Sequence, residues 1–194
     1  MASLADFVVS KVRVKLLKVL LENPKEMYHV RGLVRRTSEE INAVRRELAR
    51  MEEAGMVKKE PRGNRLYYWF RVEYGFFPEL LRLVAKTTGL GFAIRKNRGK
   101  LGKVNFVMFS GEFVRHAEKK DKDKVDILVV GDVVLPELAN LVRAEEAKRQ
   151  IEINYTPMTK DEFQFRKSRR DPFVLGILTS SRVVILGDEE EFVN

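Results

Sequence analysis

The stretch RRELARMEEAGMVKKEPRGNRLYYWF, residues 45–70, changes its hydrophobic period in the middle. Before Gly55, apolar residues such as Leu48 and Met51 recur at helical spacing. After Gly55, aromatic and β-branched residues flank PRGN at 61–64, a composition typical of a tight turn. Glycine can end a helix because it adopts the left-handed conformation without steric cost. The stretch therefore predicts a helix that ends near Gly55 and is followed by a two-stranded hairpin.

Two patterns upstream predict two more helices. Apolar residues from Val12 to Leu20 fall on one helical stripe, which ends near ENP at 22–24. Residues 27–36, MYHVRGLVRR, place apolar side chains on one side of a second helix and three arginines on the other. With the helix before Gly55, three helices therefore precede the hairpin.

The third helix is predicted to begin at TSEE, residues 37–40. Thr37 and Glu40 have the spacing of a capping box, in which each side chain accepts a hydrogen bond from the other residue's backbone N–H. The helix has an apolar stripe and a polar face. The apolar stripe comprises Ile41, Val44, Leu48 and Met51. The polar face carries Asn42, Arg45, Arg46 and Ala49, with Arg50 close by.

Three helices and a hairpin with a basic tip, in this order, resemble the winged helix-turn-helix of bacterial and archaeal transcription regulators. The resemblance covers about residues 8–72 and is most specific over residues 45–70. It implies that the third helix enters the major groove of DNA and that the hairpin, called the wing, reaches the backbone or the adjoining minor groove. The residues implied in DNA contacts are Ser38, Asn42, Arg45, Arg46, Arg62, Asn64 and Arg65.

The chemistry of these side chains agrees with the implied contacts. The amide and guanidinium groups on the third helix suit base edges, and the polar residues at the hairpin tip suit phosphates. Two alternatives stay open, because these residues can simply solvate a helix and because such a module can dock a protein. YYW at 67–69 is expected to pack within the hairpin rather than to stack on bases.

The chain of 194 residues carries a formal net charge of +9, and most of the excess lies in its first part. Residues 1–76 contain 16 Lys and Arg against 10 Asp and Glu, a net charge of +6, and residues 77–194 contain 21 against 18, a net charge of +3. The excess favours a polyanionic partner, which we expect to be double-stranded DNA. The alternative is a highly charged, solvated surface of the kind that heat-adapted proteins carry.

Composition disfavours several classes of protein. The chain has no cysteine, so neither a disulfide nor a thiolate metal site is available, and its two histidines are too few for a histidine-rich metal cage. We find no leader-like segment at the N-terminus and no apolar stretch long enough to span a bilayer. We therefore expect a soluble, cytoplasmic protein that does not bind membranes.

A predicted helix joins the two halves of the chain. FFPELLRLVAKTTGLG, residues 76–91, predicts a helix that begins near Pro78 and ends at the glycines. Its apolar face, formed by Leu80, Leu81 and Val84, is available for packing between the halves or for a homodimer, which a regulator that reads palindromic DNA requires. The expected parts are a DNA-binding domain over 1–74, a helical connector over 75–103 and a second domain over 104–194.

Strand and helix patterns alternate in the second domain. Strands are predicted at 104–109, 125–131, 151–158 and 182–188, and helices at 111–120, 135–150, 160–167 and 171–180. The alternation predicts a small α/β domain with a mixed sheet. The chain as a whole is therefore expected to belong to the α+β class.

Three stretches of this domain are similar to the minimal nucleotidyltransferases of the DNA polymerase β superfamily. They are FSGEFVRHAEKKDKDKVDILVVGD at 109–132, IEINYTPMTKDEF at 151–163 and DPFVLGILTSSRVVILGD at 171–188. The family places a Gly-Ser pair beneath the phosphates of the nucleotide. Two acidic residues that flank one apolar residue, and a third acidic residue from a later strand, hold the metal ions.

The chain departs from this family at residues that carry the chemistry. Gly111 matches the family glycine, but Glu112 follows it where serine is usual, and a carboxylate there would repel a triphosphate. Asp126 matches the second metal-binding acid. Its partner position is Lys124, whose ammonium can occupy the place of the metal and form an ion pair with Asp126.

The third acidic position of the family corresponds to Glu152 or Asn154, which share a face of the predicted strand. Asp121 and Asp123 are possible substitutes for the missing acid. They lie in the lysine-rich segment EKKDKDK, which is more typical of a solvated turn.

Two functions follow from the two resemblances. The first is a DNA-binding transcription regulator whose second domain is catalytically inactive, holds no cofactor and serves assembly or ligand sensing. The alternative is an active nucleotidyltransferase that uses Mg²⁺ and a nucleoside triphosphate to modify a protein or a nucleic acid, with Asp126, Glu152 and a loop aspartate as metal ligands. A non-specific architectural DNA-binding protein is a third interpretation.

Overall fold

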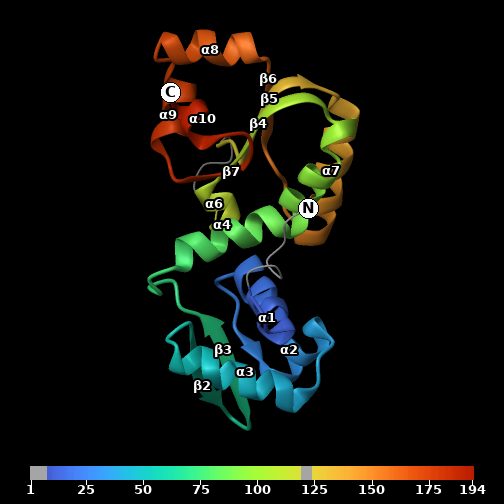
Figure 1. The fold of residues 1–194 in the computed structure, drawn as a ribbon, viewed down its shortest axis with the longest axis vertical. Coiled ribbons are helices and arrows are strands. Elements are labelled where there is room, and N and C mark those ends of the chain that lie inside the picture. The colour runs from blue at the N-terminus through green and yellow to red at the C-terminus, as the bar shows by residue number, and fades with distance from the viewer. Residues whose placement is uncertain (1–7, 119–123) are drawn as a thin grey trace. The chain divides into compact units, whose positions relative to one another are not determined.

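The computed structural model describes residues 8–118 and 124–194. The chain divides into two compact units, Met1–Thr87 and Thr88–Asn194, which are called unit 1 and unit 2 below (Figure 1). Each unit combines helices with a β-sheet, so the expected α+β class is confirmed. The segment 75–103, predicted as a connector, is divided between the two units.

Unit 1 has an antiparallel sheet of strand order β1-β3-β2. Its elements are α1 (Lys11–Glu22), β1 (Tyr28–His29), α2 (Val30–Thr37), α3 (Ile41–Glu53), β2 (Val57–Arg62), β3 (Arg65–Phe70) and α4 (Phe77–Thr87). Three helices followed by a hairpin is the order that the sequence patterns predict. The two-residue strand β1 has no such signal, because a pattern of period two needs a longer segment to be recognised.

Apolar stripes on α1, α2 and α3 form the core of unit 1. Val44, Leu48 and Met51 of α3 are fully buried, as predicted, whereas Ile41 at the start of the helix is half-buried. Their buried partners on the other two helices are Leu16, Leu17, Leu20, Leu21 and Leu33. Because a buried Leu, Val or Met side chain stabilises a fold by roughly 1.5–3 kcal/mol, these stripes provide most of the force that assembles the helices.

An acidic residue, Glu47, lies within the buried stripe of α3 and is only 3% exposed. Its carboxylate accepts hydrogen bonds from the guanidinium group of Arg13 and from the hydroxyl group of Ser10 (3.1 Å), both at the start of α1. A carboxylate is tolerated in a core only when it is paired and hydrogen-bonded. The pairing therefore restricts how the start of α1 meets α3.

The capping box predicted for Thr37 and Glu40 is wrong. Thr37 is the last residue of α2, where its hydroxyl group donates to the carbonyl oxygen of Leu33 (2.7 Å). Glu40 alone caps α3, because its carboxylate accepts the backbone N–H groups of Asn42 (2.8 Å) and Ala43 (2.9 Å), and these bonds lower the pKa of Glu40. The physical reason is that α2 continues to Thr37, so only Glu40 has the extended backbone that an N-cap needs.

The turn between α3 and β2 satisfies the backbone groups at the end of the helix. The N–H of Met56 donates to the carbonyl oxygen of Met51, and the N–H of Gly55 donates to that of Glu52, both at 2.8 Å. This pair of bonds is a Schellman motif, and it requires the left-handed backbone that Gly55 adopts with φ of 72°. The motif sends the chain directly from α3 into the hairpin.

The last helix of unit 1, α4, packs against α1. Its Phe77 ring lies 5.9 Å from the ring of Phe70 at the end of β3. Leu81 and Val84 are buried within the single chain, and Leu80 is half-buried. The apolar face that the sequence leaves available for a second copy is therefore largely covered already.

Unit 2 has a mixed sheet of strand order β6-β5-β4-β7, in which only β5 and β6 are parallel. Its helices are α5 (Gly89–Lys96), α6 (Gly111–Val114), α7 (Leu135–Arg149), α8 (Lys160–Ser168), α9 (Pro172–Thr179) and α10 (Glu189–Val193), with a 3₁₀ turn at Arg98–Lys100. Its strands are β4 (Gly102–Ser110), β5 (Ile127–Val133), β6 (Tyr155–Met158) and β7 (Arg182–Leu186). The predicted alternation and mixed sheet are thus present.

The sheet of unit 2 is buried on both faces, which explains the continuous apolar run of β5. Phe106 of β4 and Leu128 of β5 share one apolar cluster with Phe163 of α8 and Phe192 of α10. Val129, the next residue along β5, is also fully buried and points to the opposite face. Figure 1 shows α8, α9 and α10 on one side of this sheet and α7 on the other.

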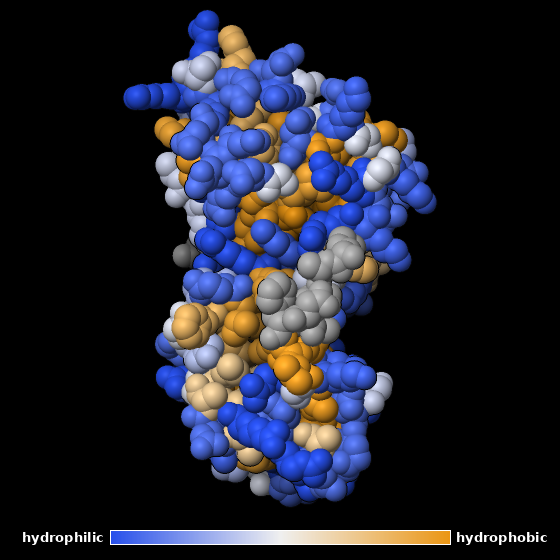
Figure 2. All heavy atoms as spheres, in the orientation of Figure 1, coloured by the Kyte–Doolittle hydropathy of each residue, from blue (hydrophilic) through white to orange (hydrophobic). Residues whose placement is uncertain are grey.

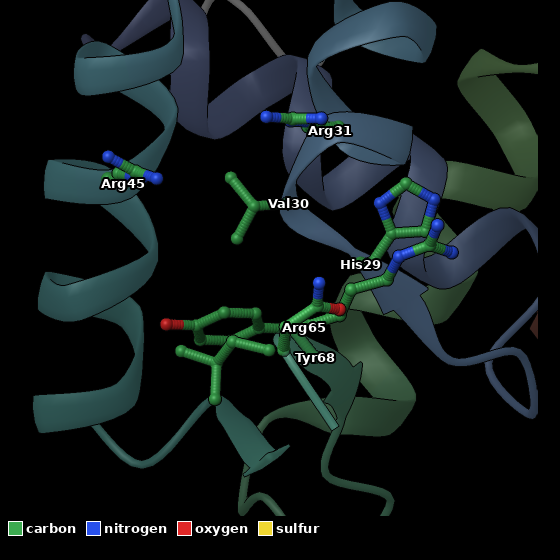
Figure 3. Close-up of a pocket in the computed structure, with 8 residues that line it drawn as sticks. His29, Val30, Arg31, Arg45, Arg65 and Tyr68 are labelled. Carbon is green, nitrogen blue, oxygen red and sulfur yellow. The ribbon is translucent and has the colours of Figure 1, made fainter. Parts of the chain in front are cut away.

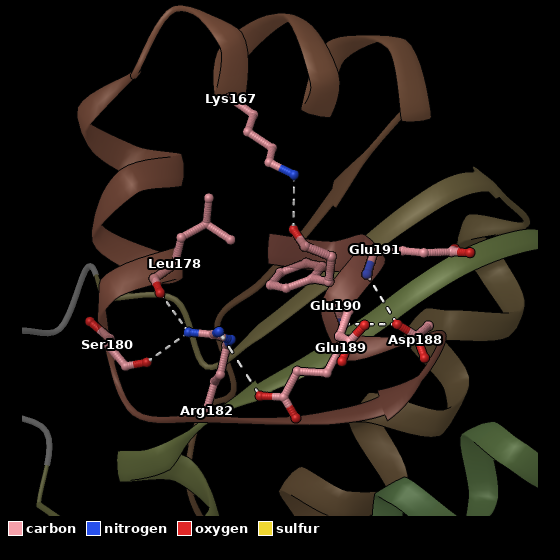
Figure 4. A network of polar contacts seen from close by, with 9 residues as sticks. Lys167, Leu178, Ser180, Arg182, Asp188, Glu189, Glu190 and Glu191 are labelled. Atoms are coloured by element: carbon pink, nitrogen blue, oxygen red, sulfur yellow. Dashed lines mark hydrogen bonds and ion pairs between the residues drawn. The ribbon is translucent and has the colours of Figure 1, made fainter. Parts of the chain in front are cut away.

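Polar contacts hold the last helix of unit 2 in place (Figure 4). Asp188 caps α10 by accepting two backbone N–H groups of its first turn, at 2.8 and 3.1 Å. Lys167 of α8 donates to the carbonyl oxygen of Phe192 (3.3 Å), and burial lowers the pKa of Lys167. Arg182 at the start of β7 donates to the carbonyl oxygen of Leu178 (2.5 Å). Arg182 Nη2 also lies 3.9 Å from Glu189 Oε1 of α10, so these contacts together connect α8, α9, α10 and β7.

Several predictions for unit 2, and for the segment 76–91 that leads into it, differ from the structure. The helix predicted to begin near Pro78 and to end at the glycines is α4, which ends at Thr87, but a second helix that the sequence did not predict, α5, begins at Gly89. Gly89 has φ of 50°, which a continuous helix does not allow. The helix predicted at 111–120 is a single turn, and 151–154 precede β6 instead of forming its first half.

The surface of each unit mixes hydrophilic and apolar residues. On the face shown in Figure 2, blue hydrophilic residues surround orange apolar ones in unit 2. Within residues 8–118 and 124–194, none of the helices combines the length and the apolar character that a bilayer span demands.

Replacing Gly55 by alanine should destabilise the protein by about 1 to 2 kcal/mol, because alanine must then adopt the left-handed backbone. No steric clash adds to this cost, since the nearest atom to the new methyl group is Arg71 Nη1 at 3.5 Å. Gly75→Ala is the matched control, because Gly75 lacks a positive φ and has nothing within 4 Å of the new methyl group. Urea denaturation measures both variants, and equal stabilities would contradict the role given to Gly55.

Candidate functional site

A hollow of about 570 Å³ lies in unit 1 between the start of α2, the exposed side of α3 and the hairpin. It is lined by His29, Val30, Arg31, Arg45, Asn64, Arg65, Leu66 and Tyr68. Figure 3 shows Arg45 on one side of this hollow, His29 and Arg65 on the other, and Arg31 and Tyr68 between them. Five of the eight side chains carry nitrogen donors, and none of them is a carboxylate.

The hollow contains some of the residues that the sequence predicts for DNA contacts. Arg45 comes from α3, and Asn64 and Arg65 come from the hairpin turn and the start of β3. Asn42 and Arg46 are exposed on α3 and lie outside the lining of the hollow. The predicted set is therefore divided into a group in the hollow and a group on the outer side of α3.

Arg62 and Ser38 are the remaining predicted residues, and each has a different local role. Arg62 donates from Nε to Glu60 (3.0 Å), and this hydrogen bond raises the pKa of Arg62. The guanidinium group of Arg62 also lies 5.8 Å from the ring centre of Tyr67. Ser38 is exposed and has a left-handed backbone (φ of 54°) at the end of α2.

Sequence reasoning missed three polar residues of the hollow, His29, Arg31 and Tyr68. Arg31 was visible as a polar residue on the second helix, but nothing local indicates that its side chain meets the hairpin. Tyr68 is buried, and burial raises the pKa of its phenol above the ordinary value. Contacts between segments some thirty residues apart carry no signal in a single sequence.

The arginines of the hollow have no acidic partners that the structure describes. Across the described residues, Arg31, Arg45 and Arg65 have no carboxylate within ion-pair distance. Four of the other eight arginines in the described part of unit 1 do pair with an acid, in Arg13–Glu47, Arg36–Glu26, Arg50–Glu47 and Arg62–Glu60. Three positive charges that no acid neutralises therefore surround one hollow.

His29 has a fixed hydrogen-bonding role at the edge of the hollow. It is the N-cap of α2, where its Nδ1 accepts the backbone N–H of Gly32 (3.1 Å). A ring that accepts at Nδ1 carries its proton on Nε2. The ring also makes an edge-on contact with Tyr67, with 5.8 Å between ring centres. His29 therefore joins the helix start to the hairpin and offers one N–H donor.

In unit 2, the residues predicted for the degenerate nucleotide site gather at two neighbouring clefts. One cleft, of about 500 Å³, is lined by Glu112, Phe113, His116, Ala117, Glu118, Asp126, Arg149, Ile151, Glu152 and Asn154. The other, of about 550 Å³, includes Lys124, Ser110 and Arg182, and it shares Glu112 with the first. Asp121 and Asp123 lie outside the described residues.

The ion pair expected between Lys124 and Asp126 is wrong. Lys124 Nζ lies 2.7 Å from Glu112 Oε1, so the two departures from the family pattern pair with each other. The physical reason is that β5 begins only at Ile127, so the same-face rule for positions two apart on a strand does not apply to Lys124 and Asp126. Asp126 is buried, and its Oδ2 accepts the backbone N–H of Asn154 (2.8 Å).

Gly111 has a packing role that requires no ligand. Its N–H donates to the carbonyl oxygen of Ser181 (2.7 Å), which brings the two chain segments into close contact. A methyl group at Gly111 would lie 2.4 Å from Ser181 Oγ and 2.8 Å from Ser181 Cβ. Glycine is therefore needed here whether or not a phosphate ever binds.

Metal-binding geometry is absent from the part of the chain that the structure describes. No group of three or more histidine or acidic residues there is arranged to hold a metal ion. Asp126 and Glu152 share a cleft with Arg149, whose guanidinium group donates to Glu145 Oε1 (2.6 Å) and lies 4.3 Å from the ring centre of Phe113. The described residues thus supply a mixed polar cleft rather than a carboxylate cluster.

Comparisons with known proteins give no additional support for either site. No family model, curated protein or solved structure matches this chain. The functional interpretation therefore depends on the geometry and the charges of the two units.

Gly111→Ala should destabilise the protein by about 1 to 3 kcal/mol, because the new methyl group overlaps Ser181. Adding Ser181→Gly should recover most of the loss, since that change removes the two closest atoms, and the third, Arg115 Nη1 at 2.9 Å, ends a flexible side chain that can move. Thermal and urea unfolding of the two single variants and the double variant measure this coupling. A double variant that is no more stable than Gly111→Ala alone would contradict the packing role.

Proposed function

We propose that this protein is a DNA-binding transcription regulator and that unit 1 is a winged helix-turn-helix domain. In this proposal α3 enters the major groove and the hairpin of β2 and β3 is the wing. The observation that carries the proposal is the hollow between α3 and the hairpin, because three arginines without acidic partners surround it and no carboxylate lines it.

The outer side of α3 supports a role in reading bases. Asn42 and Arg46 are four residues apart and exposed, so they project from the same side of the helix. An asparagine amide can form two hydrogen bonds with adenine, and a guanidinium group can form two with guanine, in the major groove. Ser38, exposed at the turn before α3, is close enough in sequence to contribute a hydroxyl group to the same surface.

A homodimer is part of this proposal, because a palindromic site is read by two copies related by a twofold axis. The interface has to be sought outside the buried face of α4, since Leu81 and Val84 are already covered. A partner of this kind would be a second copy of the chain on the same duplex.

For unit 2 we propose a nucleotidyltransferase-like domain that does not catalyse and serves assembly or ligand sensing. The ion pair between Glu112 and Lys124 supports this role, because it places a carboxylate where the family uses a hydroxyl group. The hydrogen bond between Asp126 and the backbone of Asn154 gives that acid a structural task as well. In this proposal the domain keeps its fold but has lost its catalytic activity.

An active metal-dependent nucleotidyltransferase is the second candidate. The observation that favours it is that Asp126 and Glu152 line the same cleft. The reaction would transfer a nucleotide to a protein or a nucleic acid, with Mg²⁺ polarising the phosphates. Incubation with labelled nucleoside triphosphates, Mg²⁺ or Mn²⁺ and candidate acceptors separates this candidate from the first.

Selection of bound sequences from a random duplex pool tests the proposed DNA reading. A defined motif is expected, and Arg46→Ala should then weaken binding to that motif by about 1 to 3 kcal/mol more than binding to a scrambled duplex. Asn42→Ala should act in the same direction. Arg169→Ala, on unit 2, is a control of equal charge change. Equal losses on both duplexes would show that α3 touches only the backbone.

The double change Glu112→Ser and Lys124→Asp should raise the Mg²⁺-dependent affinity for ATP at least about tenfold over the wild-type protein. It removes a repelling carboxylate and restores a hydroxyl donor and an acid, and a hydrogen bond to a charged group contributes about 1.5–3 kcal/mol. Titration calorimetry measures the affinity, with Lys124→Ala as the control for loss of the ion pair. Tight binding by the wild type that Asp126→Ala abolishes would favour the enzyme instead.

A further inference from the structure

We propose that the hollow of unit 1 binds the sugar-phosphate backbone of one DNA strand, with Arg31, Arg45 and Arg65 as its phosphate contacts. This inference rests on the proposed DNA-binding function and adds a division of labour to it. Arg45 then positions the protein on the duplex, whereas its neighbour Arg46 reads bases. The sequence assigns both Arg45 and Arg46 to base edges, so the division is a result of the tertiary structure.

The direction of Arg45 follows from its position on α3. Arg45 and Glu52 are seven residues apart, which is close to two helical turns, so they lie on the same side of the helix. Glu52 Oε2 accepts a hydrogen bond from Lys59 Nζ of β2 at 2.7 Å. The side of α3 that carries Arg45 therefore faces the hairpin.

Arg46 points elsewhere because successive residues are turned by about 100° around a helix. Its helical neighbours at four residues' distance are Asn42 and Arg50, and all three are exposed. Arg46 also lies outside the lining of the hollow. The two adjacent arginines thus serve two different surfaces, one between α3 and the hairpin and one on the outer side of α3.

The lining of the hollow is complementary to an anion with several acceptor oxygens. The guanidinium groups come from α2, α3 and β3, so a ligand that contacts all three must extend across the hollow. The amide of Asn64, the hydroxyl group of Tyr68 and the N–H of His29 add neutral donors. A phosphodiester backbone offers acceptor oxygens along its length, and arginine binds such oxygens in pairs.

The size of the hollow also fits a length of backbone better than a single ion. At about 30 Å³ for each water molecule, 570 Å³ corresponds to a space for many waters that a bound strand would displace. An acidic peptide is the other polyanion that such a lining can bind. The duplex is favoured because Asn42 and Arg46 present donors that suit base edges on the neighbouring, exposed side of α3.

Arg62 provides a control on the same hairpin. It lies three residues from Arg65 in sequence and carries the same charge, but Glu60 already neutralises it and it is not among the lining residues. Removal of Arg62 should therefore reduce the number of counterions released on DNA binding by less than removal of an unpaired arginine does. The two side chains are both exposed, so neither alanine variant is expected to disturb the fold.

The test measures affinity for the selected duplex and for a scrambled duplex by fluorescence anisotropy over a range of KCl concentrations. Arg31→Ala, Arg45→Ala and Arg65→Ala should each reduce the magnitude of the slope of log K against log salt by about one. Each should also weaken binding to the two duplexes by the same factor. Arg45→Lys should keep most of the slope. Arg62→Ala should change the slope by clearly less.

Three outcomes would overturn the inference. If the wild type binds DNA but Arg45→Ala weakens binding to the selected duplex far more than binding to the scrambled one, Arg45 reads bases. In that case the different roles given to Arg45 and Arg46 are wrong, while the proposed DNA binding stands. If the three variants leave the slope unchanged, the hollow does not hold the backbone. If the wild type binds neither duplex, the proposed function falls as well, and binding of polyglutamate in that case would assign the hollow to an acidic protein partner.

Discussion

The turn from Ala54 to Met56 is the constraint on which the arrangement of unit 1 depends. Two hydrogen bonds close the end of α3, and the left-handed backbone of Gly55 sends the chain into β2 without an intervening loop. With so short a connection, the hairpin has to lie beside α3. The pair formed by Lys59 and Glu52 shows which side of the helix faces the hairpin. The hollow is a consequence of this geometry.

Charge pairing separates structural from available arginines in this protein. Arg13 forms an ion pair with the buried carboxylate of Glu47, and Arg62 forms one with Glu60. Arg31, Arg45 and Arg65 have no such ion pair within the described residues, and they converge from three elements. Because an exposed ion pair contributes little to stability, such pairs mainly decide which positive charges remain for a polyanion. The net charge of the chain therefore says less about binding than its distribution.

In unit 2, several residues that match positions of a catalytic site have structural roles that do not depend on catalysis. Gly111 allows the close approach of Ser181, and Asp126 accepts the backbone N–H of Asn154. Glu112 and Lys124 pair with each other at the junction of two clefts. Because the fold requires these residues, they can be retained after the catalytic residues of a domain have changed.

The sequence by itself determined most of the elements and their order. Stripes such as Val44, Leu48 and Met51, and the change of period at Gly55, depend on neighbours within a few residues, so a single chain reveals them. It did not determine the cap of α3, where the extent of α2 left Glu40 rather than Thr37 as the N-cap, nor the partner of Lys124. Only the tertiary structure decided that Arg31, Arg45 and Arg65 share one hollow while Arg46 does not, because convergence of α2, α3 and the hairpin results from packing between distant segments.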